Sequence, residues 1–182
     1  MRVIVFAGAL LLTSGAGVSA AEFRLTSPDV APGGRIADEQ VGDAFGCKGG
    51  DASPALRWSG APTGAKSFAI GVFDPDAPGG GFWHWLIVDI PANAASLAKN
   101  AGDANAGFAP VGAVETLNDA GRPGYFGPCP PTGDRPHHYH FEVFALDVAK
   151  LGVDDSATAA AASARLGAHM LAKAEFVGLW GR

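Results

Sequence analysis

The sequence predicts a mainly β domain with one helix near its C-terminus, and three observations lead to this fold class. Short apolar runs rich in β-branched and aromatic residues alternate with glycines and prolines between residues 32 and 136, as in strands joined by turns. Both faces of these runs are apolar, which is typical of strands that are covered on both sides. A single alanine-rich stretch has helical spacing. A sandwich-like core is therefore expected, not an open sheet.

The first twenty residues have the layout of a cleavable export signal. Arg2 precedes an apolar run from Val3 to Leu12, and small residues follow up to Ala20. The run is shorter than the roughly 20 apolar residues of a transmembrane helix, although an uncleaved anchor is the alternative. We expect cleavage after Ala20, a single domain over residues 21–182, and a periplasmic or secreted protein without a transmembrane segment.

The charge of the chain excludes some partners. The net charge is −5, and there is no run of basic residues of the kind that binds nucleic acid or an anionic membrane surface. We expect no nucleic-acid partner. An anionic ligand would have to be held by local geometry and not by the overall field.

Three runs are expected to form the long strands, residues 67–73, 84–90 and 139–146. The helix is expected at about 157–173, because residues 154–156 offer N-cap and first-turn side chains and Leu166 and Met170 are spaced i, i+4. A last strand is expected at 176–180. The loop 100–118 carries no clear structural signal.

The two cysteines, Cys47 and Cys129, bear on the compartment as well as on stability. Disulfides persist in exported proteins, so one bridge is expected, closing a loop of about 80 residues and contributing about 4 kcal/mol in the chain-entropy description. Two separate buried thiols are the alternative.

The first candidate motif is Asp74-Pro75-Asp76-Ala77-Pro78, which follows a strand directly. Proline fixes its own φ angle and restricts the residue before it, so Asp74 and Asp76 should hold set directions at the strand end. A simple turn is the alternative. His84 begins the next strand, where an imidazole could present one ring nitrogen to a ligand, although a lone histidine is more often a hydrogen-bonded core residue.

The second candidate motif is Gly127-Pro-Cys-Pro-Pro131 followed by His137-His-Tyr-His140. Alternation along a strand would direct His137 and Tyr139 to one face and His138 and His140 to the other. This pattern argues against a four-histidine metal site, and no metal or cofactor is expected. Imidazoles and a phenol hydroxyl between proline-shaped walls are suited to a phosphate or carboxylate group. The two aspartates could accept an ammonium group or orient His84.

Together with residues 82–84, these motifs resemble the phosphatidylethanolamine-binding protein (PEBP) family, in its bacterial Raf kinase inhibitor-like branch. The segment 51–58 is similar to the N-x-S-P-x-L-x-W segment of that branch, and the resemblance covers about residues 23–180. It differs at two places: Asp51 stands where asparagine is usual, and His138 stands where arginine is usual. We expect these differences to affect the rim of a pocket more than the pocket itself.

The resemblance implies a PEBP-like fold, in which a large antiparallel sheet packs on a smaller sheet with few helices. It also implies a small cavity at one end of the main sheet that holds phosphate, acetate or a phospholipid head group. The matching residues are Asp74, His84, Pro131, His137 and Tyr139, with Asp76 and Trp83 as expected neighbours. Exported bacterial relatives carry cysteines at the positions of Cys47 and Cys129, which favours the disulfide.

Three functions follow as hypotheses, since a fold does not determine a function. The first is an exported binding module for a small anion or a zwitterionic head group such as phosphoethanolamine. The second is a protein-interaction or inhibitor module that docks a protease or host protein through the pocket rim, including the loop 100–118. The third is an enzyme, with Asp76 and a histidine in acid–base roles. We expect no enzymatic activity, and the chain lacks the familiar hydrolase, nucleotide-binding and zinc-protease motifs.

Overall fold

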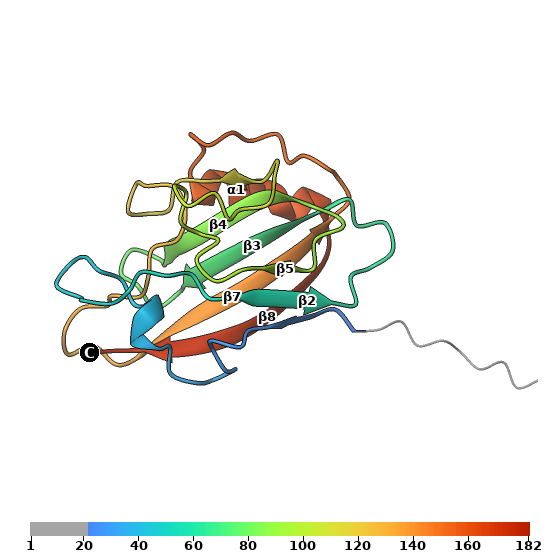
Figure 1. The fold of residues 1–182 in the computed structure, drawn as a ribbon. Coiled ribbons are helices and arrows are strands. Elements are labelled where there is room, and N and C mark those ends of the chain that lie inside the picture. Colours follow the sequence, from blue (N-terminus) through green and yellow to red (C-terminus); the bar gives the residue numbers. More distant parts are fainter. Residues whose placement is uncertain (1–21) are drawn as a thin grey trace, which may run out of the picture.

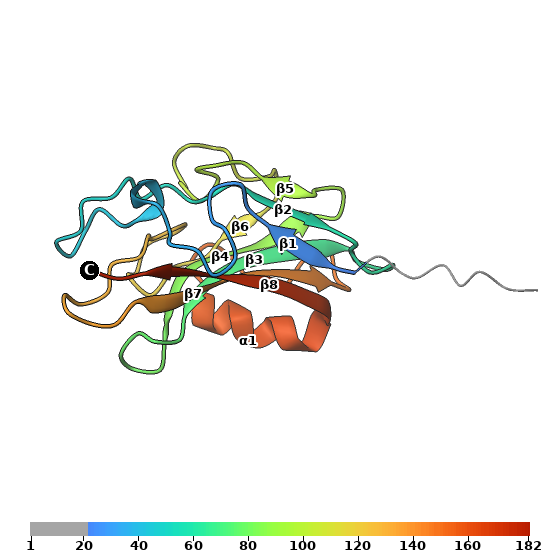
Figure 2. The same ribbon diagram turned by 90° about the horizontal axis from the view of Figure 1, so that it is seen from below.

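The computed structural model describes residues 22–182. The expected signal segment and its cleavage site lie outside the described residues. The described chain forms three layers: a small sheet, a large sheet and one helix (Figure 1). Figure 2 shows the small sheet on one face of the large sheet and the helix α1, Ala159–His169, on the other. The predicted fold class, a mainly β protein with two antiparallel sheets and a C-terminal helix, is confirmed.

The large sheet has the strand order β6-β4-β3-β7-β8, and each strand is antiparallel to its neighbours. The bounds of its strands are β3 Ser67–Asp74, β4 Phe82–Pro91, β6 Val114–Glu115, β7 His137–Leu146 and β8 Met170–Trp180. The small sheet has the order β1-β2-β5, with β1 Arg24–Thr26, β2 Leu56–Ser59 and β5 Ser96–Leu97. A short 3₁₀ helix, Asp38–Gln40, precedes β2.

Both faces of the large sheet are buried along β3, as the sequence predicts. Phe68, Ile70 and Val72 face the small sheet and belong to the larger hydrophobic core. Ala69 faces the helix, where it packs in a second cluster with Leu166. Each layer therefore covers one apolar face, because alternate residues of a strand point to opposite sides.

The helix is shorter than expected at both ends. Thr158, not the 154–156 segment, is the N-cap residue, and its hydroxyl accepts a hydrogen bond from the backbone N–H of Ala161 at 3.2 Å. Residues 170–173 belong to β8, where Met170 pairs with Leu146 of β7. The prediction of a helix to 173 was wrong because strand pairing along the whole of β7 satisfies more backbone groups than one more helical turn. The last strand consequently begins at Met170 instead of residue 176.

A disulfide joins Cys47 to Cys129 and so confirms the predicted bridge. Cys47 lies in the loop after the 3₁₀ helix, and Cys129 lies in the proline-rich segment before β7. The bridge connects residues 82 positions apart. It holds two long loops together at the end of the large sheet where β3 ends and β7 begins.

Candidate functional site

The two sequence motifs meet at one end of the large sheet. Because the strands are antiparallel, the end of β3 lies beside the start of β4 and near the start of β7. Asp74 pairs with Phe82, and Phe73 pairs with both Trp83 and His140. Segments that are about 60 residues apart in the chain are thereby brought to a single edge of the sheet.

A cavity of about 130 Å³ lies at this edge. Four of the sequence-predicted polar residues line it, and they come from three adjacent strands: Asp74, His84, His137 and Tyr139. Pro131, also predicted, forms part of the wall. The remaining lining residues are mostly apolar: Phe45, Ala77, Pro78, Phe82, Phe126, Cys129 and Pro130.

A β-bulge in β4 aims His84 at the cavity. The register shifts so that Val72 pairs with Trp85 while the next residue, Phe73, pairs with Trp83. His84 is the extra residue between these pairs. A bulge of this kind redirects a side chain and is common beside functional sites. Strict alternation would place His84 and Trp85 on opposite faces of the sheet. The bulge instead puts both side chains on the core side.

Asp74 and His137 form a buried pair, 2% and 3% exposed. Nδ1 of His137 donates a hydrogen bond to Oδ2 of Asp74 at 2.7 Å, and the backbone N–H of Asp76 donates to Oδ1 at 2.9 Å. The Asp-Pro-Asp turn therefore orients the carboxylate, which in turn orients the imidazole. Nε2 of His137 is the polar ring atom that remains, and it lies 3.7 Å from the carboxylate of Asp134.

His84 is held by a backbone carbonyl. Its Nδ1 lies 2.6 Å from the carbonyl oxygen of Phe126, and the ring is tilted against Phe82 and meets Tyr139 edge-on. A carbonyl oxygen only accepts, so Nδ1 carries the proton. Burial lowers the pKa of His84 from its ordinary 6.5 to about 4, although the carbonyl and Asp74 oppose this effect. The ring is accordingly neutral at physiological pH.

The phenol of Tyr139 is fully buried. Its hydroxyl has no hydrogen-bond partner among residues 22–182. Burial raises its pKa, and the nearby Asp74 raises it further. The hydroxyl therefore keeps its proton and remains free to donate to a ligand.

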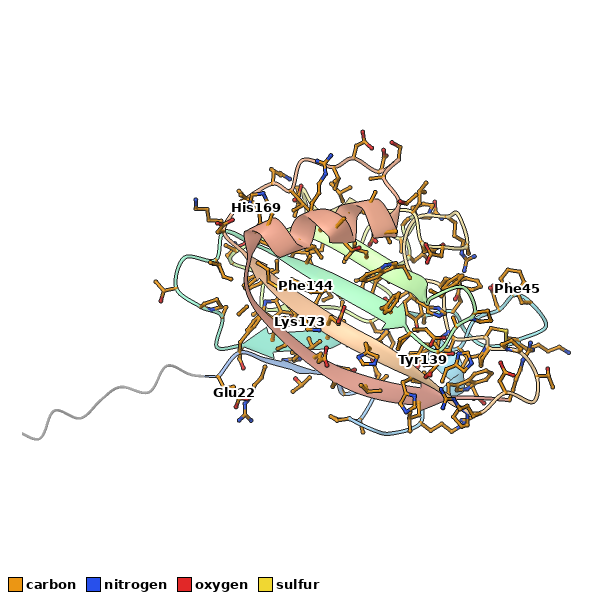
Figure 3. All side chains as sticks on the ribbon, turned by 180° about the vertical axis from the view of Figure 1, so that it is seen from behind. Glu22, Phe45, Tyr139, Phe144, His169 and Lys173 are labelled. Atoms are coloured by element: carbon orange, nitrogen blue, oxygen red, sulfur yellow. A yellow bond between two sulfur atoms is a disulfide. The ribbon has the colours of Figure 1, made fainter. Side chains whose placement is uncertain are left out.

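The mouth of the cavity is apolar and exposed on one side. Phe45 is 71% exposed and packs edge-on against Phe126, with ring centroids 5.7 Å apart. Its φ angle is +53°, an unfavourable backbone conformation for a bulky residue. The adjacent disulfide and the bond from Arg182 to the carbonyl of Phe45 hold this loop in place. Figure 3 shows Phe45 and Tyr139 at the same end of the molecule.

Two predicted neighbours lie outside the lining of the cavity. Asp76 points to the rim, where it binds Arg135 at 2.7 Å and both the backbone and the ring of His138. Its pKa is lowered to about 2, chiefly by the hydrogen bond from His138. Trp83 packs against Phe73 with tilted rings, whose centroids lie 4.8 Å apart, on the helix side of the sheet. The bulge at His84 explains why Trp83 faces away.

The sequence reasoning missed the aromatic part of the wall. Phe45 and Phe126 are far apart in the chain and belong to no recognised motif, so only their positions next to Cys47 and the Gly-Pro-Cys-Pro segment could have indicated them. Phe82 belongs to the segment 82–84, which carries part of the family resemblance. Its side chain joins the cavity wall because it lies two residues before His84.

Neither departure from the family pattern lines the cavity: His138 lies beside Asp76 at the rim, and Asp51 lies elsewhere. Asp51 accepts a hydrogen bond from the backbone N–H of Gly127 at 2.6 Å and forms an ion pair with Arg122. It lines a second, more polar groove of about 380 Å³ together with Asn100 and Asp103. The first part of the loop 100–118 thus borders this second groove. No residue of the loop 100–118 lines the first cavity, and the carbonyl oxygen of Gly102 in this loop accepts a hydrogen bond from the backbone N–H of Tyr125 at 2.8 Å.

Two further properties concern the described range only. No group of three or more histidine, cysteine, aspartate or glutamate side chains within residues 22–182 is arranged to hold a metal ion. Over the same residues, no helix has the length and apolar character needed to cross a membrane.

The fold and the site define a class: a two-sheet β domain with one small pocket of carboxylate, imidazole and phenol groups at the end of its larger sheet. The family model described as phosphatidylethanolamine-binding protein matches residues 26–181. The chain belongs to this family.

The relatives agree with this assignment. The UPF0098 protein YbcL of Escherichia coli is 46% identical over 157 residues, which cover 86% of each protein. The E. coli UPF0098 protein YbhB is 36% identical over 158 residues, or 86% of this chain and 99% of that protein. The crystal structure of E. coli YbcL, described as a new member of the mammalian PEBP family, superposes with a TM-score of 0.87 at 45% identity. That match covers 89% of this chain and 99% of the YbcL chain.

Proposed function

We propose that this protein is an exported binding module for a small anionic group, such as phosphate or the head group of phosphoethanolamine. One observation carries the proposal. Three polar groups line one apolar-walled cavity, and each has an atom left for a ligand: His84, His137 and the hydroxyl of Tyr139. Few, well-placed polar groups in an apolar pocket are characteristic of small-ligand sites.

The size of the cavity favours a head group over a whole lipid. About 130 Å³ is below the roughly 300–1,000 Å³ of pockets that bury a drug-sized ligand. The apolar mouth, with Phe45 and Pro78, would contact whatever is attached to the bound group. We therefore propose head-group or soluble-ligand recognition.

The aspartates support an orienting role over an ammonium-binding role. Both oxygens of Asp74 accept hydrogen bonds from the protein, and Asp76 is occupied by Arg135 and His138. Asp134, with its side chain 47% exposed, is the carboxylate closest to the free nitrogen of His137. We propose Asp134 as the acceptor for the ammonium group of a zwitterionic ligand.

The proposed location is the periplasm or the exterior of the cell. The N-terminal sequence has the layout of an export signal, and the disulfide between Cys47 and Cys129 fits an oxidising compartment. We also propose that the protein binds its ligand without catalysing a reaction on it.

Calorimetric titration of residues 21–182 with phosphate, acetate and phosphoethanolamine tests this function. We expect saturable binding by the wild type and at least a tenfold loss in a His84→Ala, His137→Ala double variant. His169→Ala is the matched control, because His169 lies at the opposite end of the molecule (Figure 3). Circular dichroism verifies that all variants fold. Absence of binding by the wild type would contradict the proposal.

A protein partner is the second candidate, and the exposed Phe45 favours it. A side chain that is 71% exposed beside a cavity is typical of an interface anchor. The second candidate predicts that envelope or host proteins are retained by the wild type and lost with Phe45→Ser. If the double histidine variant retains the same proteins as the wild type, the proteins dock on the rim and do not depend on ligand binding in the cavity.

A further inference from the structure

Strand β8 forms one margin of the large sheet, and within residues 22–182 only the C-terminal part of its outer edge is paired (Figure 1). The N–H of Gly33 donates a hydrogen bond to the carbonyl oxygen of Val177. Leu179 donates to Gly34 and accepts from Ile36. Residues 33–36 therefore cover the edge from Val177 onward.

The part of the edge before Val177 is open. In an antiparallel ladder, alternate residues direct their backbone groups toward the same neighbour. Val177 and Leu179 face outward, so Lys173 and Glu175 do so as well, and they stand opposite Phe144 and Glu142 of β7 without bonding to them. The N–H and C=O groups of Lys173 and Glu175 have no hydrogen-bond partner within residues 22–182.

The open edge has space beside it. A groove of about 390 Å³ lies between this part of β8 and strand β1, lined by Glu22–Thr26 and by Lys173–Glu175. On the groove side the strand carries the small side chain of Ala174, which packs against the larger core. No bulky side chain of β8 therefore stands at the centre of the open edge, and a second strand can approach the backbone there.

The charges on the edge are compensated. Nζ of Lys173 lies 2.8 Å from Oε1 of Glu142 on β7, and it also forms an ion pair with Glu175. An edge lysine commonly prevents the pairing of a second strand. Here two carboxylates offset its charge, so it does not by itself repel a second strand that carries the same pattern.

We propose that two copies of this protein pair through the open edges of β8, antiparallel and related by a two-fold axis at Ala174. In this register Lys173 of one copy lies opposite the partner's Glu175, and Glu175 lies opposite the partner's Lys173. Each of these opposite pairs exchanges two backbone hydrogen bonds, so all four free groups of each copy find partners. Opposite charges across the strands stabilise the same register.

Neighbouring registers are less favourable. A two-fold axis at Lys173 places two lysines directly opposite each other, which is destabilising, and it places Glu175 opposite Leu171, beside the register shift at the start of the strand. An axis at Glu175 places two glutamates opposite each other and brings the partner against the covered edge at Val177. Because a two-fold contact uses the same edge of both copies, assembly stops at a dimer.

Sedimentation equilibrium of residues 21–182 at micromolar to millimolar concentrations tests the pairing, and we expect a monomer–dimer equilibrium for the wild type. Lys173→Glu sets glutamates against glutamates, and Glu175→Lys sets lysines against lysines. Each single variant should dimerise at least tenfold more weakly. An equimolar mixture of the two variants restores both opposite-charge pairs and should form a heterodimer about as strong as the wild-type dimer. Lys48→Glu, which makes the same charge change in the loop that carries Cys47, should dimerise as the wild type does.

Amide hydrogen exchange of the wild type gives a second measurement that needs no variant. The N–H groups of Lys173 and Glu175 should become protected as the protein concentration rises. Those of Ala172 and Ala174 face β7 and should be protected at every concentration, which makes them controls within the same strand.

Three results would overturn the inference. The first is a wild type that stays monomeric up to millimolar concentration. The second is a dimer that neither single variant weakens, because the copies would then meet at another surface. The third is exchange at Lys173 and Glu175 that does not change with concentration. This last measurement decides the matter even if a charge variant does not fold.

Discussion

At the scale of single residues, burial determines which side chains have unusual protonation states. Glu115 on β6 accepts a hydrogen bond from the indole N–H of Trp85 at 2.7 Å. Its other carboxyl oxygen is buried and has no partner among residues 22–182. Burial raises the pKa of Glu115 from its ordinary 4.5 to about 7, against the effect of the bond from Trp85. The protonated form therefore dominates below neutral pH.

The raised pKa of Glu115 predicts that the folded protein is less stable at neutral and mildly alkaline pH than at acidic pH. A carboxyl group with a raised folded-state pKa supports the fold fully below pH 4.5, and its contribution is lost as the pH rises to about 7. The shift corresponds to on the order of 3 kcal/mol. We expect that Glu115→Gln, which keeps the acceptor for Trp85, removes this part of the pH dependence.

Urea unfolding of both proteins at pH 4.5, 6 and 8 measures the effect. The stability of the variant relative to the wild type should increase with pH by on the order of 2–3 kcal/mol. A constant difference across this pH range would show that Glu115 titrates normally in the folded protein.

At the scale of elements, the length of each element depends on its neighbours. Helix α1 is shortened because Met170 and the residues after it pair with β7. The helix remains attached to the large sheet by Leu166 and Ala162, which are buried against Leu86 and Val88 of β4. The residues on the exposed face of the helix make no such contacts, so their contribution to stability depends on intrinsic helix propensity.

Gly167 lies on that exposed face, and a Cβ added there would meet no atom within 4 Å. Its backbone is helical, so alanine fits without strain. We expect Gly167→Ala to raise the free energy of unfolding by about 0.5–1 kcal/mol, because alanine restricts the unfolded chain and favours the helix.

Thr158→Ala in the same helix serves as the control of opposite sign. It removes the N-cap hydrogen bond to Ala161 and should cost about 1 kcal/mol. Chemical denaturation of both variants beside the wild type measures the two effects. A destabilised Gly167→Ala protein would show that this face of the helix is constrained by more than propensity.

At the scale of the whole molecule, the disulfide links the wall of the cavity to the stability of the fold. Cys129 lines the cavity, and the bridge spans 82 positions of the chain. Cys47 is buried against the larger core. The same bond therefore restricts the unfolded chain and holds the loop that carries Phe45 at the mouth.

We expect a Cys47→Ser, Cys129→Ser double variant to lose about 4 kcal/mol of stability in the chain-entropy description. Thermal unfolding of the variant and of the wild type, with and without a reducing agent, measures this loss. Reduction should lower the midpoint of the wild type only. Equal midpoints for the oxidised wild type and the double variant would mean that tertiary contacts alone hold the two loops.

The sequence by itself determined the fold class, the family, the disulfide and the positions of Asp74, His84, His137 and Tyr139. The fold class follows from local patterns, namely strand alternation and turn residues at strand ends. The family and the four positions follow from the resemblance of the two motifs to a known family, and the disulfide from that resemblance and from the compartment in which cysteines pair. The alternation of His137 and Tyr139 with His138 was correct because β7 is regular where it begins.

Only the tertiary structure decided which side chains share the cavity. The bulge at His84 arises from the pairing of β4 with β3, so no property of the β4 sequence alone could direct Trp83 to the opposite face. Asp76 was diverted to the rim by Arg135 and His138, and the helix ended early because β7 offered backbone partners. In each case a long-range contact outweighed a local preference. The free energy gained by pairing and packing the strands of the sheet exceeds the conformational preference of any single turn.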